Sequence, residues 1–174
     1  MRRLLLHLPV AALALIVCGA CGPSIDVGKT IHIVDISGGF HDAGVDDAGR
    51  NKIVPSISFR VEKSTDASVH PLSLNLLFKK VPLPGTPPPA GAPSGTLEDW
   101  DEFYVQNVDF NGNTTAPLTI RSKAGYTGDP PMSRAEILTN HLFQDVVVII
   151  FAKHRSSQWV KVAQYQLPRK LLTD

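Results

Sequence analysis

The strongest constraint on the fold is an apolar run near the end of the chain. Residues 146–151 read Val-Val-Val-Ile-Ile-Phe, and six consecutive apolar residues, mostly β-branched, predict a strand buried on both faces. Turn formers follow, and the chain then alternates so that one face would carry Trp159, Ala163, Tyr165 and Leu167. This pattern predicts a β-hairpin in which residues 145–152 form the central strand and Trp159 caps the core.

We expect different surroundings for the two faces of that strand. Val146, Val148 and Ile150 would share one face, and Val147, Ile149 and Phe151 the other. We expect one set to fill the space between two sheets. The other set is expected beneath a helix at residues 133–142 or beneath a covering loop.

Alternation predicts further strands upstream. Residues 30–37 form the first, with a mid-strand bulge or switch of face. Residues 53–63 form the next, with Ile57, Phe59 and Val61 pointing inward, and residues 72–78 pair with it. Pro55 cannot donate to a ladder, so it is expected at the start of its strand.

The Gly- and Asp-rich stretch between the first two strands, residues 38–51, is predicted to be a solvated loop. His41, Asp42, Asp46 and Asp47 suggest a metal site, but the calcium-loop spacing of the EF-hand is absent. Asp also favours turns. A turn is therefore the preferred interpretation.

The middle of the chain combines a loop, an edge strand and a helix. Residues 81–96 hold six prolines and three glycines, which predicts a solvated loop between strands. Residues 99–108 are interpreted as an edge strand guarded by carboxylates. Asn111-Gly112 predicts a turn, residues 117–122 a short strand, and Ser133-Arg-Ala-Glu136 a capping box that begins the helix.

The N-terminus has the three parts of an export signal. Arg2 and Arg3 precede an apolar stretch from Leu4 to Val17, and Gly19-Ala20 lies directly before Cys21. This resembles the signal of bacterial lipoproteins, which ends in a small residue followed by the cysteine that is lipidated. Position 18 is Cys where the family usually has Leu. The resemblance implies a signal peptide at residues 1–20, a lipid such as palmitate on Cys21, a tether at residues 21–28 and a domain at residues 29–174. A simple secretory signal is the alternative.

The part of the chain from Cys21 onward is nearly neutral. Without Arg2 and Arg3 it has 15 basic and 16 acidic residues, which argues against nucleic acid or an anionic membrane surface as an electrostatic partner. The partners expected are the membrane, through the lipid on Cys21, and a protein of the cell envelope. Because Gly22 follows the cysteine, the resemblance implies the outer membrane, facing the periplasm.

The predicted fold class is all-β, as a single sandwich of about seven strands with one short helix after the signal peptide. The strand order resembles immunoglobulin-like and fibronectin type III-like domains. The stretch from Ala124 to Leu167, with Gly125-Tyr126, the short helix and the Val-rich strand, is similar to uncharacterised bacterial lipoproteins. These resemblances carry no known active site.

Two kinds of function remain open. The residue patterns show no nucleophile elbow, zinc-protease motif or phosphate loop, so no enzyme and no cofactor or metal site is predicted. A structural or protein-interaction module is the first interpretation. The alternative is a ligand-binding module, for example for carbohydrate, that uses Trp100, Phe103 and Tyr104. Exposed rings in one plane would favour the alternative, and rings buried in the core would favour the first.

Overall fold

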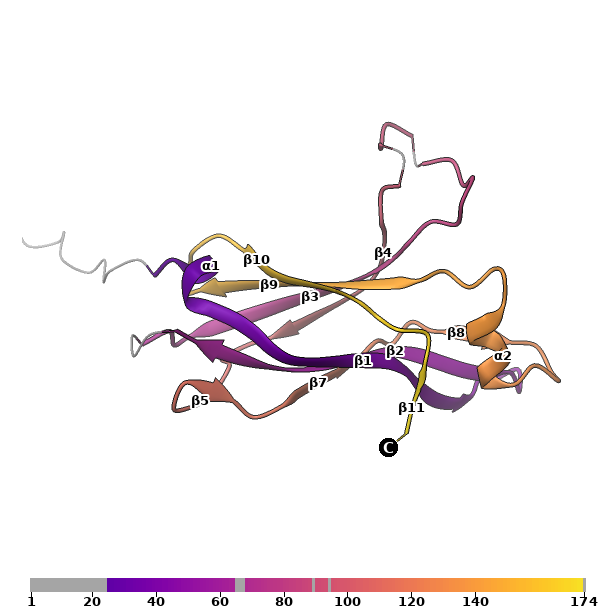
Figure 1. Ribbon diagram of the computed structural model, residues 1–174, viewed down its shortest axis with the longest axis horizontal. Helices are drawn as coiled ribbons and strands as arrows, with labels where there is room; N and C mark the ends of the chain where they lie inside the picture. The colour runs from indigo at the N-terminus through magenta and orange to yellow at the C-terminus, as the bar shows by residue number, and fades with distance from the viewer. Residues whose placement is uncertain (1–24, 65–67, 89, 94, 174) are drawn as a thin grey trace, which may run out of the picture.

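Two β-sheets pack face to face in the computed structural model, which describes residues 25–64, 68–88, 90–93 and 95–173 (Figure 1). The four-stranded sheet has the order β10 (Val160–Gln166), β9 (Val146–His154), β3 (Leu72–Lys80) and β4 (Glu98–Val105). The seven-stranded sheet is built on β1 (Ile31–Val45) and β2 (Asn51–Lys63). Around them lie β5 (Phe110–Asn111), β6 (Thr114–Thr115), β7 (Leu118–Arg121), β8 (Tyr126–Gly128) and β11 (Leu171–Leu172).

This architecture confirms the all-β sandwich. The described residues form more strands than the seven predicted, because several pieces of two to four residues pair along β2 and β1. They also form two short helices, α1 (Val27–Thr30) and α2 (Arg134–Thr139), where one was predicted. The strand order in each sheet is compatible with an immunoglobulin-like or fibronectin type III-like arrangement.

The predicted central hairpin is present. Strand β9 lies between β3 and β10 and pairs antiparallel with both. Its side chains Val146, Val148, Ile150 and Ala152 are fully buried in the core, together with Phe78 of β3. The same core takes Ile57, Phe59 and Val61 of β2, as the alternation predicted. The predicted pairing of residues 72–78 with β2 is wrong, because β3 pairs with β4 and β9 in the other sheet.

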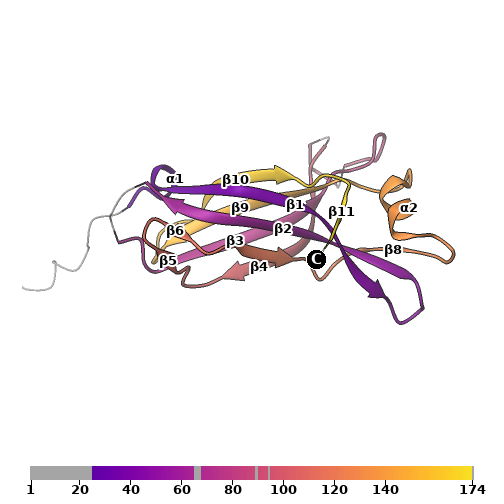
Figure 2. The same ribbon diagram turned by 60° about the horizontal axis from the view of Figure 1, so that its bottom comes forward.

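The outer face of the four-stranded sheet, which points away from the other sheet, differs from the prediction. Of the three residues predicted on that face, Val147 is buried, while Ile149 and Phe151 are half-buried. Helix α2 does not cover them. It packs at one end of the molecule on β8 and β2 (Figure 2). This contact is close, because the Cβ of an alanine at Gly128 would lie 2.7 Å from Ile137.

Trp159 also departs from the prediction, because it does not cap the core. A bulge between Lys161 and Ala163 shifts the register of β10 by one residue. Ala163 and Tyr165 therefore face inward, while Trp159 lies on the opposite face, where its ring meets that of Tyr104.

The stretch predicted as a loop at residues 38–51 is mostly strand. Strand β1 continues to Val45, with bulges after Val34 and after Asp42. Gly38 and Gly39 are buried, and a Cβ on Gly39 would lie 2.7 Å from the carbonyl oxygen of Lys170. These glycines allow the close approach of the C-terminal segment, where β11 pairs in parallel with β1.

Pro55 lies inside β2 instead of at its start. Its partner across the ladder is Phe40, whose backbone N–H donates away from β2 to Lys170. The nitrogen of Pro55 therefore points to the other side, into the gap between the end of β7 at Arg121 and the start of β8 at Tyr126. No ladder donor is needed there, so the proline is tolerated.

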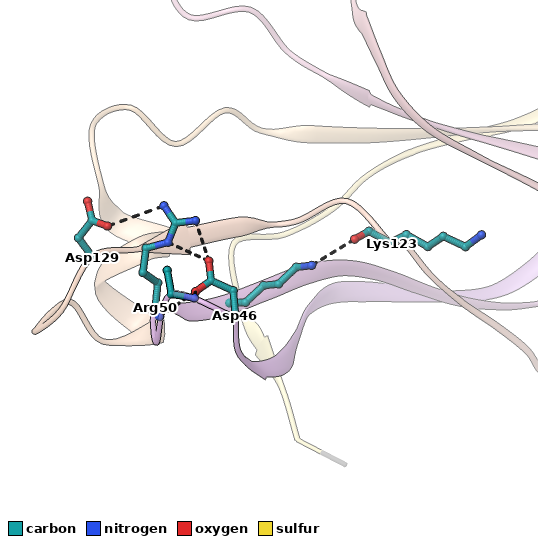
Figure 3. A network of polar contacts seen from close by, with 6 residues as sticks. Asp46, Arg50, Lys123 and Asp129 are labelled. Carbon is teal, nitrogen blue, oxygen red and sulfur yellow. Dashed lines mark hydrogen bonds and ion pairs between the residues drawn. The ribbon is translucent and has the colours of Figure 1, made fainter.

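The tip of the β1–β2 hairpin is a tight turn held by Asp46 (Figure 3). The carboxylate of Asp46 accepts hydrogen bonds from the backbone N–H groups of Ala48 and Arg50 and forms a 2.7 Å ion pair with the Arg50 guanidinium. The hydrogen bonds from Arg50 hold the pKa of Asp46 below its usual value. Asp46 thus has the turn-forming role that the sequence suggested.

Four other predictions are confirmed. Strand β4 is an edge strand, the described residues between β3 and β4 form a largely exposed loop, and Asn111-Gly112 forms the β5–β6 turn. Ser133 and Glu136 form the capping box of α2. At the other end Ile25 and Val27, assigned to the tether, pack on the core, so the packed domain begins before residue 29.

Candidate functional site

The three rings singled out from the sequence do not share one face. Phe103 points inward and packs edge-on against Phe78, at 6.0 Å between ring centroids. Trp100 lies in the bulge of β4 and packs on Tyr126, at 4.8 Å. Tyr104 points outward and is 60% exposed. Two of the three rings therefore belong to the edge of the core.

A hollow of about 460 Å³ lies beside Trp100, lined also by Leu77, Asp99, Asp101 and Glu102. Its carboxylates are engaged within the protein. Asp99 forms an ion pair with Lys79, and Glu102 accepts a 2.7 Å hydrogen bond from the amide of Asn75. The hollow is acidic, but these groups have internal partners.

Asp101 joins the two sheets. It accepts hydrogen bonds from the Ser122 hydroxyl and the Lys123 N–H, each at 2.7 Å, and from the Ala124 N–H. Burial alone would raise the pKa of Asp101, but these hydrogen bonds outweigh it and the pKa is lowered. The ionised carboxylate of Asp101 thus connects β4 to the segment between β7 and β8.

The outer face of the four-stranded sheet carries an aromatic pair that the sequence did not predict. Tyr104 from edge strand β4 and Trp159 from the start of β10 reach toward each other, with ring centroids 6.2 Å apart and planes tilted by 54°. The Lys153 ammonium lies 4.8 Å from the Trp159 ring centroid. Below them Asn75 is 8% exposed, and its side-chain oxygen has no hydrogen-bond partner.

A second surface lies at the end of the sandwich formed by β8 and α2, opposite α1 (Figure 1). A hollow of about 250 Å³ there has an apolar floor made by Tyr126, Met132, Ile137 and Phe143. Leu142 at its edge is 64% exposed, and Val45 of the neighbouring hairpin is 61% exposed.

Tyr126 anchors this end. Its hydroxyl donates a 2.7 Å hydrogen bond to the carbonyl oxygen of Gln144, and its ring packs on Phe143 and Phe40. Burial raises the pKa of Tyr126 well above its usual value. The hydroxyl stays protonated at neutral pH and acts as a fixed donor.

The described part of the chain holds no group of three metal-ligating side chains, and none of its helices is long and apolar enough to cross a membrane. His154 is 7% exposed, whereas His32 and His141 lie at the surface. Cys21 and His7 are outside the described residues.

Comparisons with known proteins add no relative. No family model, no curated protein and no solved structure matches this chain.

Proposed function

We propose that this chain is a lipid-anchored protein of the bacterial cell envelope whose sandwich is a non-catalytic module that binds a protein partner. The anchor is the lipid on Cys21, and the location is the outer membrane facing the periplasm. Support for the anchor comes from Gly19-Ala20-Cys21 after the apolar stretch.

The observation that carries the binding role is the apolar surface at the end opposite α1. Leu142 is exposed at the edge of the hollow floored by Met132, Ile137 and Phe143, and Val45 is exposed on the β1–β2 hairpin that Arg134 of α2 contacts. Exposed apolar groups gathered in one place are typical of protein–protein sites. The hollow is smaller than the roughly 300–1,000 Å³ of small-molecule sites. Its size suits one apolar side chain of a partner.

The ligand-binding alternative rests on the hollow beside Trp100, whose volume of about 460 Å³ lies within the range for small molecules. The tilt of Trp100 against Tyr126 and the engagement of the neighbouring carboxylates speak against a flat sugar platform. Carbohydrate titrations of a Trp159→Phe variant, in which Trp100 is the remaining tryptophan, would support this alternative if the change in emission saturates with carbohydrate concentration.

Replacing Cys21 with Ser tests the anchor. The parent should fractionate with membranes and the Cys21→Ser variant should not, and mass spectrometry of the mature N-terminus should find acyl groups on Cys21. An unmodified N-terminus elsewhere in the chain would contradict the proposal.

The binding surface needs a separate experiment. A photo-crosslinking residue at position 142 should give a discrete protein adduct in intact cells. The same residue at exposed position 119, on β7, is the matched control and should give none. Equal adducts, or none, at both positions would count against the end of the sandwich at α2.

A further inference from the structure

The end of the sandwich that carries α1 is tied closely to the proposed anchor. Ile25 packs on the core and Val27 is 3% exposed, so the chain is fixed to the domain from about this point. Three residues lie between Cys21 and Ile25, so four Cα–Cα steps join them. A chain of that length spans at most about 14 Å in any conformation. A lipid on Cys21 therefore holds this end of the domain beside the headgroups.

The β9–β10 turn lies next to α1. A Cβ at Gly28 would lie 3.3 Å from the Val160 side chain, and both views show the turn beside the helix (Figures 1 and 2). Residues 153–161 contain Lys153, Arg155 and Lys161 and no acidic residue. A basic residue near an anionic bilayer contributes about 1 kcal/mol of attraction.

Acidic groups near this turn already have partners. Asp26 forms a 3.3 Å ion pair with Lys29, and Glu102 accepts the hydrogen bond from Asn75. The Asn75 hydrogen bond does not remove the charge of Glu102, which also lies against Tyr104, but the segment 153–161 itself contributes three basic side chains and no acidic one.

The aromatic pair lies on the same part of the molecule. Trp159 belongs to this turn, and Tyr104, 60% exposed, lies against it. Tyrosine and tryptophan favour the boundary between water and hydrocarbon, because each has an apolar ring and a polar tip.

We propose that Trp159, Tyr104 and the basic residues of the β9–β10 turn form a seat on the phospholipid headgroups of the membrane that carries the anchor. This inference rests on the proposed lipidation of Cys21. The seat fixes the orientation of the sandwich, so that the surface around Leu142 points away from the bilayer.

The two tryptophans of the chain offer a direct test. Trp100 packs on Tyr126 of β8, toward the opposite end. The full-length lipidated protein is placed in phosphatidylethanolamine–phosphatidylglycerol vesicles that contain headgroup spin-labelled lipid. The Trp100→Phe variant, which keeps Trp159, should be quenched several-fold more than the Trp159→Phe variant.

A charge variant probes the basic residues. Arg155→Glu should reduce the quenching of Trp159, whereas Lys170→Glu, on an exposed lysine before β11, should leave it unchanged. The quenching of the parent should also rise with the fraction of anionic lipid.

The outcomes separate the seat from the anchor. Vesicle-bound protein in which both tryptophans are quenched equally or not at all overturns the seat and leaves the anchor intact. Protein that does not sediment with vesicles and carries no lipid overturns the proposed function itself. Trp159 emission that responds to a soluble glycan but not to vesicles also overturns the seat and favours a ligand site at the aromatic pair.

Discussion

At the scale of the residue, Asp101 shows how one carboxylate of an acidic stretch differs from its neighbours. Glu98, Asp99, Asp101 and Glu102 look equivalent in the sequence. Asp101 alone among them is hydrogen-bonded to the link between β7 and β8 in the other sheet. Hydrogen bonds to a charged acceptor are stronger than neutral ones.

Asp101→Asn should lower the free energy of unfolding by about 1–2 kcal/mol, because the charged acceptor is lost while the shape is kept. Asp99→Asn is the matched control on the same strand, since its carboxylate is 80% exposed and pairs with Lys79 at the surface. A surface pair contributes about 0–1 kcal/mol. Chemical denaturation measures the free energy of unfolding of both variants. Equal decreases would refute the role of Asp101 in connecting the two sheets.

At the scale of the element, the strands were predictable wherever alternation runs unbroken. Ile57, Phe59 and Val61 in β2 are an example. Trp159 was misplaced because the bulge before Ala163 inverts the alternation, and a bulge leaves no clear trace in residue types. Gly38-Gly39 predicts a loop but lies in β1, since glycine serves both turns and close backbone approach.

The residues of the candidate sites also come from segments that lie far apart in the sequence. The sequence singled out Tyr104 as a contact residue, but its neighbour Trp159 lies 55 positions along the chain. The hollow near Leu142 is assembled from β8, α2 and the segment before β9. Such surfaces depend on how the elements pack, and spacing along one segment does not contain that information.

The loop at residues 81–97 gives a prediction at this scale. Its described residues are exposed from Pro84 to Pro88, and it projects from the sandwich (Figure 1). Shortening it to a tight turn between Lys80 and Glu98 should change the melting temperature by only a few degrees, because closure entropy varies slowly with loop length. Thermal denaturation tests this, and loss of cooperative unfolding would show that the loop supports the core.

At the scale of the whole molecule, several carboxylates make stability depend on acid. The pKa values of Asp42, Asp46, Asp101 and Glu136 are all lowered in the folded protein. The leading favourable causes are hydrogen bonds from Gly44, Arg50, Ser122 and Ser133 respectively. Their stabilising effect is full above the unfolded pKa values of about 4 and is lost as pH falls through the folded values.

We therefore expect the free energy of unfolding to be level near neutral pH and to decrease from about pH 5 downward. Denaturation series at fixed ionic strength should show this decline, with a shallower slope in Asp101→Asn. A flat profile down to pH 2 would contradict the assignment of these carboxylates.

The position of β9 in the sandwich has a consequence for export. Strand β3 ends at Lys80, but its inner neighbour β9 begins only at Val146. When such a chain is threaded through a membrane pore from its N-terminus, as proposed here, the four-stranded sheet stays incomplete until the last fifth of the chain has crossed. Pairing over such long sequence separations is slow. If the chain is exported in this way, the sandwich can therefore close only after β9 and β10 have crossed.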